Sequence, residues 1–246
     1  MAAEKQDLDV VVLAAGVGTR LRPVTDEVPK CLVEVAGQPI LGWLLHQLQD
    51  MRELADLKIY VLAGYRAGDV DTFVDSVDLP VNVVINKDYE KTNNMYSLYL
   101  SFPHLGPGKD VIVINGDCIY DKEFVEEFLV LPSSAIAVDS SVYYQESMKV
   151  RVRDGYVRAI SKELQPSADV FTSIDLYRFS GSVREALVKT VSSYVERGEL
   201  TQWTEVAIHQ MLQDEDVYVQ TYDIAGGPWM EIDTIEDLSR AEELFR

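Results

Sequence analysis

The sequence has little cysteine and no long apolar run. Its 246 residues include two cysteines, Cys31 and Cys118, which form no C-x-x-C pair, so neither a disulfide framework nor a cysteine-rich metal site is expected. No run approaches the roughly 18 apolar residues that a membrane-spanning helix needs, and the first residues lack the basic and apolar regions of a secretion signal. We therefore expect a protein of the reducing cytoplasm that is not inserted in a membrane.

Positive charge is also scarce. Lysine and arginine number 22 against 41 aspartates and glutamates, which gives a formal net charge of −19. A protein that binds a nucleic-acid backbone needs a broad basic face, so nucleic acid is not expected as a partner. The cations that do cluster, Arg20, Arg22 and Lys30, suit a small anionic ligand instead.

The order of apolar patterns indicates the fold. Strand-like and helix-like segments alternate in the first half of the chain, which predicts a three-layer α/β/α, Rossmann-like arrangement with a mostly parallel, mixed sheet. With 47% apolar residues, the chain can bury a full core. The expected strands are 7–13, 57–63, 81–85 and 110–115, and the expected helices are 40–49, 67–77 and 93–102.

The second half of the chain has a different pattern. Asp154-Gly155, between the apolar segments 148–152 and 156–160, predicts a β-hairpin. Thr234 and Asp237 predict a capping box for a final helix that begins at Ile235. No linker or low-complexity segment interrupts the chain, so we expect a single domain over residues 1–246. The other expected elements are strands at 170–179 and 217–222 and helices at 183–196 and 204–212.

A glycine-rich loop follows the first expected strand. It reads Leu13-Ala-Ala-Gly-Val-Gly-Thr-Arg-Leu-Arg-Pro23, and its glycines allow backbone N–H groups to approach a polyphosphate. A tight turn without a ligand is the alternative. A dinucleotide-binding loop would have glycine in place of Leu21, and a P-loop would end in Gly-Lys-Ser or Gly-Lys-Thr. The pattern therefore favours a loop that holds a nucleoside triphosphate with its own cations.

This loop, followed by Pro29-Lys30, resembles the signature of the nucleotidyltransferases that join a nucleoside monophosphate to a phosphorylated sugar or alcohol. The segments Thr92–Leu100, Asn115-Gly-Asp117 and Trp229–Thr234 are similar to the choline-phosphate and aminoalkylphosphonate cytidylyltransferase branch. The resemblance covers essentially the whole chain. It implies CTP as the donor, Mg²⁺ as the divalent metal, a nucleotide-binding half over about 1–120 and an acceptor-binding half over about 121–246.

The resemblance also assigns residues to the nucleotide. Lys30 would bridge the α-phosphate and the attacking group. Arg20, with Arg22 beside it, would hold the leaving pyrophosphate, because a planar guanidinium pairs two oxygens at once. Lys30 and Arg20 are thus the expected catalytic residues. The expected nucleotide-binding residues are Leu13, Ala14, Ala15, Gly16, Gly18, Thr19, Arg20 and Asn86.

Three carboxylates are candidates for the Mg²⁺ site. Asp117 follows an expected strand, and Glu231 and Asp233 would point to the same face of an extended segment. Mg²⁺ prefers oxygen ligands and usually takes one or two carboxylates together with substrate phosphates. By resemblance, Asp117 and Asp233 are ligands and Glu231 is a ligand or a near neighbour. The alternative is a turn residue for Asp117 and the start of the terminal helix for the other two.

The acceptor needs cations for its phosphate and a partner for its head group. Lys162 is similar to the family's second substrate-binding lysine, and Lys149 is the alternative. A primary amine needs a carboxylate, such as Asp175, whereas choline needs an aromatic cage, for which Tyr144, Tyr177, Trp203 and Trp229 are candidates that could equally be core residues. The choline branch often has a tryptophan near residues 145–148, which this chain lacks. The expected acceptor-binding residues are Asn94, Lys149, Lys162, Asp175, Tyr177 and Trp229.

The predicted function is transfer of CMP from CTP to a small phosphorylated or phosphonate head group, such as 2-aminoethylphosphonate or phosphocholine, with release of pyrophosphate. A sugar-1-phosphate or inositol-1-phosphate nucleotidyltransferase is the alternative within the enzyme class. A non-catalytic, nucleotide-binding regulatory relative is the alternative outside it. No feature of the sequence predicts the oligomeric state.

Overall fold

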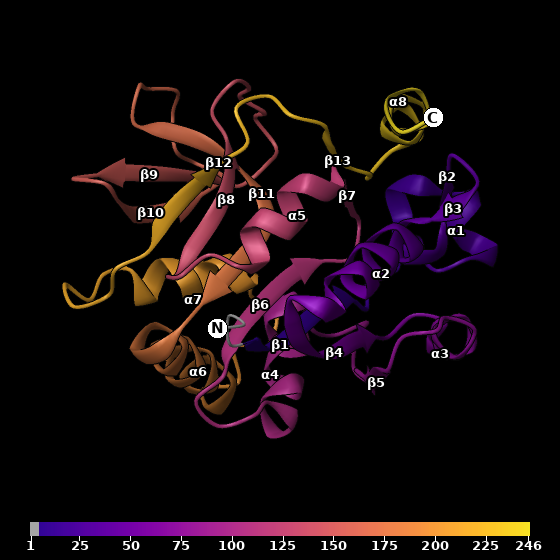
Figure 1. The fold of residues 1–246 in the computed structure, drawn as a ribbon, viewed down its shortest axis with the longest axis horizontal. Coiled ribbons are helices and arrows are strands. Elements are labelled where there is room, and N and C mark those ends of the chain that lie inside the picture. The colour runs from indigo at the N-terminus through magenta and orange to yellow at the C-terminus, as the bar shows by residue number, and fades with distance from the viewer. Residues whose placement is uncertain (1–4) are drawn as a thin grey trace.

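A nine-stranded sheet forms the middle layer of the computed structural model, which describes residues 5–246 (Figure 1). The main path of the sheet runs β10-β9-β11-β6-β1-β4-β5, and β8 pairs with both β11 and β12. The strands are β1 (Gln6–Ala14), β4 (Ala55–Ala63), β5 (Val81–Ile85), β6 (Asp110–Asn115), β8 (Ala135–Asp139), β9 (Lys149–Arg153), β10 (Tyr156–Ser161), β11 (Val170–Phe179) and β12 (Gln220–Asp223).

Pairing is parallel in the first half of the sheet and mixed in the second. β1 pairs in parallel with β4 and β6, and β4 pairs in parallel with β5. β11 runs antiparallel to β6, β8 and β9, whereas β12 runs parallel to β8. This arrangement confirms the predicted three-layer fold with a mostly parallel, mixed sheet.

Alternation along β1 explains why helices cover both faces of the sheet. Val10 and Val12 point into one hydrophobic cluster, and Val11 and Leu13 point into another, because successive side chains of a strand face opposite sides. The helices that contribute to the first cluster are α2 (Ile40–Asp50), α3 (Ala67–Asp75) and α5 (Lys122–Leu129). Those that contribute to the second are α4 (Asn94–Ser101), α6 (Gly181–Glu196) and α7 (Thr204–Met211).

Small elements close one end of the molecule. The C-terminal helix α8 (Ile235–Leu244) packs beside the short hairpin β2 (Glu34–Val35) and β3 (Gln38–Pro39), close to α1 (Val24–Glu27) (Figure 1). A separate two-stranded ladder joins β7 (Cys118–Tyr120) to β13 (Trp229–Glu231). These segments pack against the glycine-rich loop, because Leu21 of that loop shares a hydrophobic cluster with Ile119, Ile232 and Ala241.

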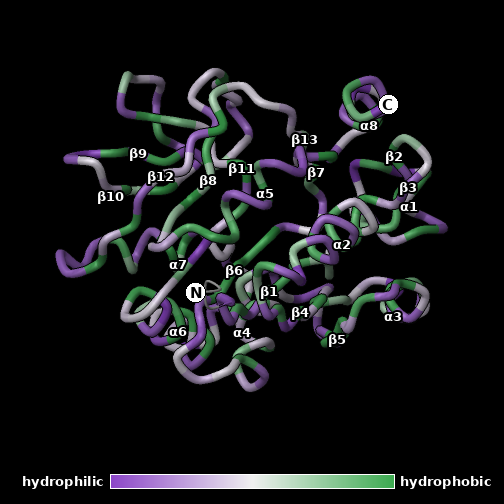
Figure 2. The backbone as a smooth tube through the Cα atoms, viewed as in Figure 1, coloured by the Kyte–Doolittle hydropathy of each residue, from purple (hydrophilic) through white to green (hydrophobic). Residues whose placement is uncertain are grey.

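Hydropathy follows this layering. The central strands are predominantly hydrophobic, whereas hydrophilic residues are frequent in α8 and in the loops at the periphery (Figure 2). Within residues 5–246, no helix has both the length and the apolar character needed to cross a bilayer.

The register of the parallel strands brings their carboxyl ends to one edge. Ala14 lies opposite Ala63, and Leu13 lies opposite Asn115. The loops that follow β1, β4 and β6 therefore leave the sheet together, which is the usual position of a ligand in an open α/β sheet.

Several sequence predictions of local structure are confirmed. β9 and β10 form the expected hairpin, and Asp154 and Gly155 have the positive φ values, 52° and 80°, that a tight hairpin turn requires. Thr234 and Asp237 form the capping box of α8.

The strand expected at 217–222 is shifted. Val217 and Val219 are buried core residues, but β12 begins only at Gln220. The alternation of Val217 and Val219 therefore reflects burial of their side chains in the core, not pairing with a neighbouring strand. Helices α1 and α5 and strands β2, β3, β7 and β8 were not predicted.

Candidate active site

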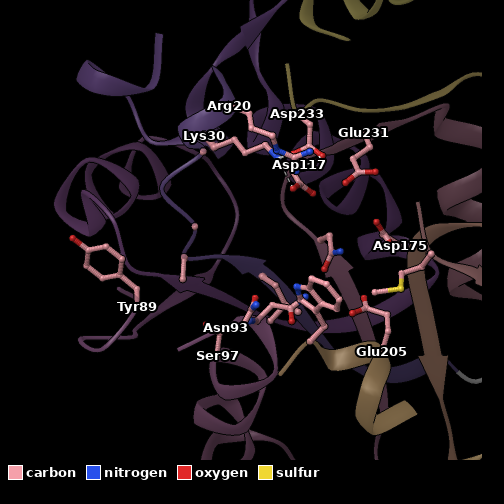
Figure 3. A pocket seen from close by; sticks show the side chains of 18 of the residues that line it. Arg20, Lys30, Tyr89, Asn93, Ser97, Asp117, Asp175, Glu205, Glu231 and Asp233 are labelled. Atoms are coloured by element: carbon pink, nitrogen blue, oxygen red, sulfur yellow. Dashed lines mark hydrogen bonds and ion pairs between the residues drawn. The ribbon is translucent and has the colours of Figure 1, made fainter. Parts of the chain in front are cut away.

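A cavity of about 350 Å³ opens at the carboxyl edge of the parallel strands. Figure 3 shows cations and carboxylates gathered at one end of it, with Lys30 and Arg20 beside Asp117 and Asp233. Asp175 and Glu205 lie further along the cavity (Figure 3). We name the first group the cationic end and the second group, Asp175 and Glu205, the acceptor end, after the role that we propose for it below.

The loop after β1 is shaped by close contact with Lys30. Gly18 has a φ of 66°, and a Cβ added there would lie 2.9 Å from the Cβ of Lys30. Thr25 fixes the same turn, because its hydroxyl donates a hydrogen bond to the Gly18 carbonyl at 2.7 Å. The glycine therefore permits both the left-handed backbone and the approach of the lysine stem.

Lys30 lies between two carboxylates. Its Nζ is 2.6 Å from Asp117 Oδ2 and 2.6 Å from Asp233 Oδ1. Burial alone would lower the pKa of Lys30, but attraction to Asp117 and Asp233 and the hydrogen bonds to them outweigh burial and raise it. Lys30 is therefore an ammonium at neutral pH.

Arg20 completes the cationic end. Its guanidinium donates to Asp233 Oδ2 at 2.7 Å. Burial would raise the pKa of Asp233, but Lys30 and Arg20 more than offset it, and the pKa of this carboxyl is lowered. Arg22, by contrast, pairs with exposed Asp26 at 3.1 Å and is not among the residues that line the cavity.

Glu231 is a third carboxyl at the cationic end, where the cations that line the cavity are Lys30 and Arg20. Carboxylate oxygens of Asp117, Glu231 and Asp233 lie within 4.8 Å of one another. Burial, followed by repulsion from Asp175, Asp117 and Asp233, raises the pKa of Glu231 to about 9. Glu231 therefore keeps its proton at neutral pH unless a further cation binds beside it, and three such oxygen ligands suit a hard divalent metal.

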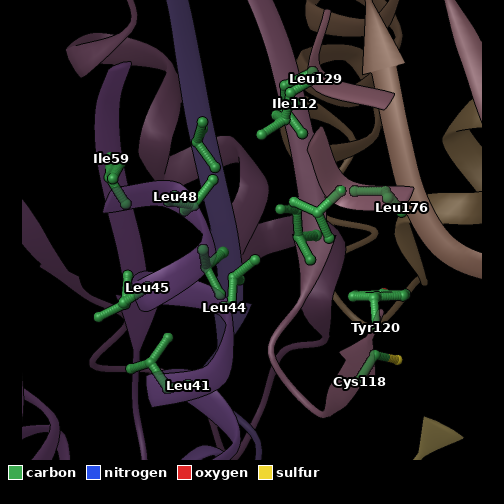
Figure 4. Packing of buried hydrophobic residues seen from close by; sticks show 14 of the residues in the cluster. Leu41, Leu44, Leu45, Leu48, Ile59, Ile112, Cys118, Tyr120, Leu129 and Leu176 are labelled. Atoms are coloured by element: carbon green, nitrogen blue, oxygen red, sulfur yellow. The ribbon is translucent and has the colours of Figure 1, made fainter. Parts of the chain in front are cut away.

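The β7–β13 ladder brings the three carboxylates together. Glu231 of β13 is paired with Cys118 of β7, and the Asp117 carbonyl accepts a hydrogen bond from the Ile232 N–H at 2.9 Å. Cys118 and Tyr120 belong to the main hydrophobic cluster (Figure 4), and the Tyr120 hydroxyl donates to the Ile174 carbonyl at 2.8 Å. Burial of the adjacent strand β7 in the hydrophobic core therefore fixes the backbone position of Asp117.

The acceptor end contains a pair of buried carboxyls. Asp175 has a φ of 60° and lies where the pairing of β11 with β8 changes register; such bulges commonly redirect a side chain near an active site. Tyr177 Oη is 2.8 Å from Asp175 Oδ1 and 3.0 Å from Glu205 Oε1. One hydroxyl proton serves only one of these carboxyls at a time.

Burial raises the pKa values of both carboxyls in this pair. Burial, then repulsion from Glu205 and Asp117, raises the pKa of Asp175 to about 7. Burial likewise raises the pKa of Glu205. A cation bound between them would remove the repulsion, so the pair favours a positively charged ligand group.

Glu205 was not predicted from the sequence. It lies in the first turn of α7, where an acidic residue also has an ordinary role beside the helix N-terminus. Its neighbour Thr204 donates its N–H to Asn94 Oδ1 at 2.8 Å, which joins the starts of α7 and α4. No local pattern of residues shows that these two helix starts meet.

The two predicted lysines are placed differently. Lys162 lines the cavity, with Nζ 5.0 Å from the centre of the Trp203 ring. Lys149 is fully buried outside the lining, and its Nζ donates to the Gln145 carbonyl at 2.7 Å. The structure therefore brings Lys162, and not Lys149, to the cavity surface.

Three other predicted residues also lie outside the cavity lining. Trp229 is buried and donates its indole N–H to Asp139 Oδ2 at 3.0 Å. Tyr177 is buried behind Asp175 and Glu205, and Ala14 packs in the core. Their apolar surfaces are used for packing, so a direct contact with substrate would require the site to rearrange.

The remaining predicted residues do line the cavity. They are Leu13, Ala15, Gly16, Gly18, Thr19, Arg20, Lys30, Asn86, Asn94, Asp117, Lys162, Asp175, Glu231 and Asp233. Asn86 is fixed by donating its side-chain amide to Thr92 Oγ1 at 3.0 Å and to Ser97 Oγ at 3.1 Å. The lining residues without a predicted role include Tyr89, Ser97, Asn115, Glu146 and Glu205.

The fold and the place of this cavity define an α/β protein whose candidate ligand site lies at the carboxyl edge of its parallel strands. The nucleotidyl transferase family model matches residues 9–245, so the chain belongs to the nucleotidyl transferase family and is a nucleotidyltransferase.

Two relatives and one solved structure show the range of this similarity. The chain is 29% identical to "Bifunctional IPC transferase and DIPP synthase" of Aquifex aeolicus over 95% of its length, but it spans only 50% of that protein. It is 26% identical to the choline-phosphate cytidylyltransferase of Streptococcus pneumoniae, covering 97% of this chain and 99% of the relative. A solved CTP:phosphocholine cytidylyltransferase from Streptococcus pneumoniae has the same fold, with a TM-score of 0.79, 22% identity and coverage of 97% of this chain and 99% of that one.

The contact between Gly18 and Lys30 gives a test of the loop. Gly18→Ala should lower the free energy of unfolding by about 1 to 3 kcal/mol, because alanine must adopt a left-handed backbone and push against the Lys30 stem. The measurement is urea unfolding at neutral pH.

Gly68→Ala is the matched control. Gly68 lies in α3, and a Cβ there would meet no atom within 4 Å. This variant should be at least as stable as the parent, since alanine favours a helix. Equal stability of Gly18→Ala and the parent would contradict the account of the loop.

Proposed function

We propose that this protein is a CTP-dependent cytidylyltransferase that transfers CMP to a small phosphate or phosphonate whose other end carries a cation. 2-Aminoethylphosphonate and phosphocholine are the acceptors that fit this description. The observation that carries the proposal is that one cavity has Lys30 and Arg20 at one end and Asp175 and Glu205 at the other. The cytidylyltransferase names of its relatives support CTP as the donor.

Lys30 and Arg20 serve the nucleotide in this proposal. An oxygen of the acceptor's phosphate or phosphonate attacks the α-phosphorus of CTP, the new P–O bond forms, and the bond to the β-phosphate oxygen breaks to release pyrophosphate. Lys30 stabilises charge on the α-phosphate, and Arg20 holds the pyrophosphate. The attacking oxygen is already anionic at neutral pH, so no side chain has to remove a proton.

Mg²⁺ fits the carboxylates beside these cations. Asp117, Glu231 and Asp233 offer oxygen ligands within 4.8 Å of one another, and Glu231 is crowded by negative charge. These residues would hold the ion, which supplies positive charge for the triphosphate. Since Lys30 already contacts Asp117 and Asp233, a bound ion would compete with its ammonium for the same oxygens.

The acceptor end determines which phosphate is used. Lys162, which lines the cavity, is our candidate for the acceptor's phosphate, and Asp175 with Glu205 is our candidate for its cation. A sugar or inositol phosphate would bring uncharged hydroxyls to two repelling carboxyls. An amine or ammonium would neutralise them instead.

A pyrophosphate-release screen tests the proposal. CTP, UTP, ATP and dTTP are each combined with phosphocholine, 2-aminoethylphosphonate, 2-hydroxyethylphosphonate, inositol-1-phosphate and hexose-1-phosphates. We expect release with CTP and a cationic acceptor. Preference for UTP or dTTP with a sugar phosphate would overturn both assignments, and no release with any pair would favour a non-catalytic protein.

Lys30 is expected to act in turnover and to compete with the metal. Lys30→Met should lower kcat by about 100-fold or more, because charge on the reacting phosphate loses its partner. The same variant should bind Mn²⁺ more tightly in the absence of nucleotide, measured by calorimetry, because Asp117 and Asp233 are then free of the ammonium. Asp117→Asn should lower both kcat and the affinity for Mn²⁺.

Lys122→Met is the matched control for charge. Lys122 lies on α5, where it pairs with Asp50 at 2.7 Å, outside the cavity lining. It should retain turnover and Mn²⁺ affinity. Near-parent turnover of Lys30→Met would remove Lys30 from the reaction, and unchanged Mn²⁺ affinity would contradict the competition.

The raised pKa of Asp175 predicts a pH dependence. As pH increases through about 7, Asp175 loses its proton and becomes a better partner for an amine. The ratio of KM for 2-hydroxyethylphosphonate to KM for 2-aminoethylphosphonate should therefore increase between pH 6 and pH 8. The hydroxyl compound controls for ionisation of the phosphonate itself.

Asp175→Asn should weaken this pH dependence, since the titrating carboxyl is gone. Steady-state kinetics across the pH range provides the measurement. A ratio that stays constant with pH in the parent protein would show that Asp175 does not face the amine.

A further inference from the structure

A second cavity lies directly beyond the acceptor end. It has a volume of about 280 Å³, close to that of the active-site cavity. It lies between the end of β10, the last turns of α6 and the outer side of α7. The residues that line it and not the first cavity include Ile160, Ser161, Tyr194, Val206, His209 and Gln210.

The two cavities share a wall. Met148, Lys162, Trp203 and Glu205 line both of them. The Lys162 ammonium lies over the Trp203 ring at 5.0 Å, so a cation–π contact forms part of this wall. Trp203 immediately precedes α7 and is 44% exposed, which leaves it little packing to hold it in place.

Glu205 places the head group of the acceptor at this wall. Glu205 is 3% exposed, and its carboxyl accepts a hydrogen bond from the Tyr177 hydroxyl at 3.0 Å. In the proposed function, Glu205 and Asp175 bind the cation of the acceptor. A nitrogen at that point lies at the boundary between the cavities, so a substituent on it can extend into the second.

The lining of the second cavity favours an apolar substituent. Ile160, Val206 and the ring of Tyr194 present apolar surface. His209 is fixed by its Nδ1, which accepts a hydrogen bond from the Ile160 N–H at 3.3 Å. The acidic residues of this lining are Glu163 and Glu205.

We infer that the second cavity binds an apolar substituent, larger than methyl, on the cationic nitrogen of the acceptor. The inference rests on the proposed function and names its acceptor class more narrowly: phosphates or phosphonates of N-alkylated amines. Burial of each additional methylene strengthens binding about fourfold. An N-butyl group therefore improves kcat/KM at least tenfold over the unsubstituted amine.

The test compares N-butyl-2-aminoethylphosphonate with 2-aminoethylphosphonate in the pyrophosphate-release assay with CTP. The expected ratio of their kcat/KM values is ten or more, carried by KM. Val206→Phe fills the second cavity and should bring this ratio close to one. Gln210 belongs to the same lining but is exposed, whereas Val206 is half-buried. Gln210→Trp should therefore also bring the ratio close to one, with less risk of disturbing the fold.

Val130→Phe is the matched control. Val130 is exposed, follows α5 and lies outside both cavity linings, so this variant should retain the ratio of the parent. A parent ratio of one or less, or a ratio retained in both filling variants, would overturn the inference while leaving the proposed function intact. No pyrophosphate with any acceptor would overturn the proposed function and this inference together.

Discussion

The ion pairs of Lys30 with Asp117 and Asp233 join three distant parts of the chain. Lys30 follows the glycine-rich loop, Asp117 precedes β7, and Asp233 follows β13. Two carboxylates this close would repel each other strongly without the ammonium between them. The close packing of Gly18 against the Lys30 stem extends the same connection back to the end of β1. The shape of the cationic end therefore depends on one side chain.

The positive charge of the cavity contrasts with the negative charge of the whole protein. The protein has a net charge of −19, yet Lys30, Arg20 and Lys162 all line one cavity. That cavity also contains three carboxyls with raised pKa values: burial raises that of Glu205, and burial together with repulsion raises those of Asp175 and Glu231. A site with both features suits ligands that bring phosphate, metal and an organic cation together. A ligand with a phosphate and no cation would leave the repulsion between Asp175 and Glu205 in place.

The sequence predicted residues that lie in local motifs better than residues that meet through tertiary packing. The cations of the glycine-rich loop and the three clustered carboxylates could be identified because they lie in short local motifs that resemble those of a known family. The β7–β13 ladder could not, since three-residue strands more than 100 positions apart carry no pattern of their own. Glu205 resembles any acidic residue in a first helical turn. Lys149 and Trp229 were expected at the cavity surface, but the structure buries both because their polar atoms find partners inside the protein.

In the proposed function, Lys30 moves from Asp117 and Asp233 to the nucleotide when metal and CTP bind. A crystal structure of the protein with Mn²⁺ and CTP would show this movement, because the anomalous signal of manganese locates the ion. The account predicts manganese on Asp117 and Asp233, with the Lys30 ammonium at the α-phosphate. Manganese bound elsewhere, or Lys30 still between the two aspartates with CTP in place, would contradict it.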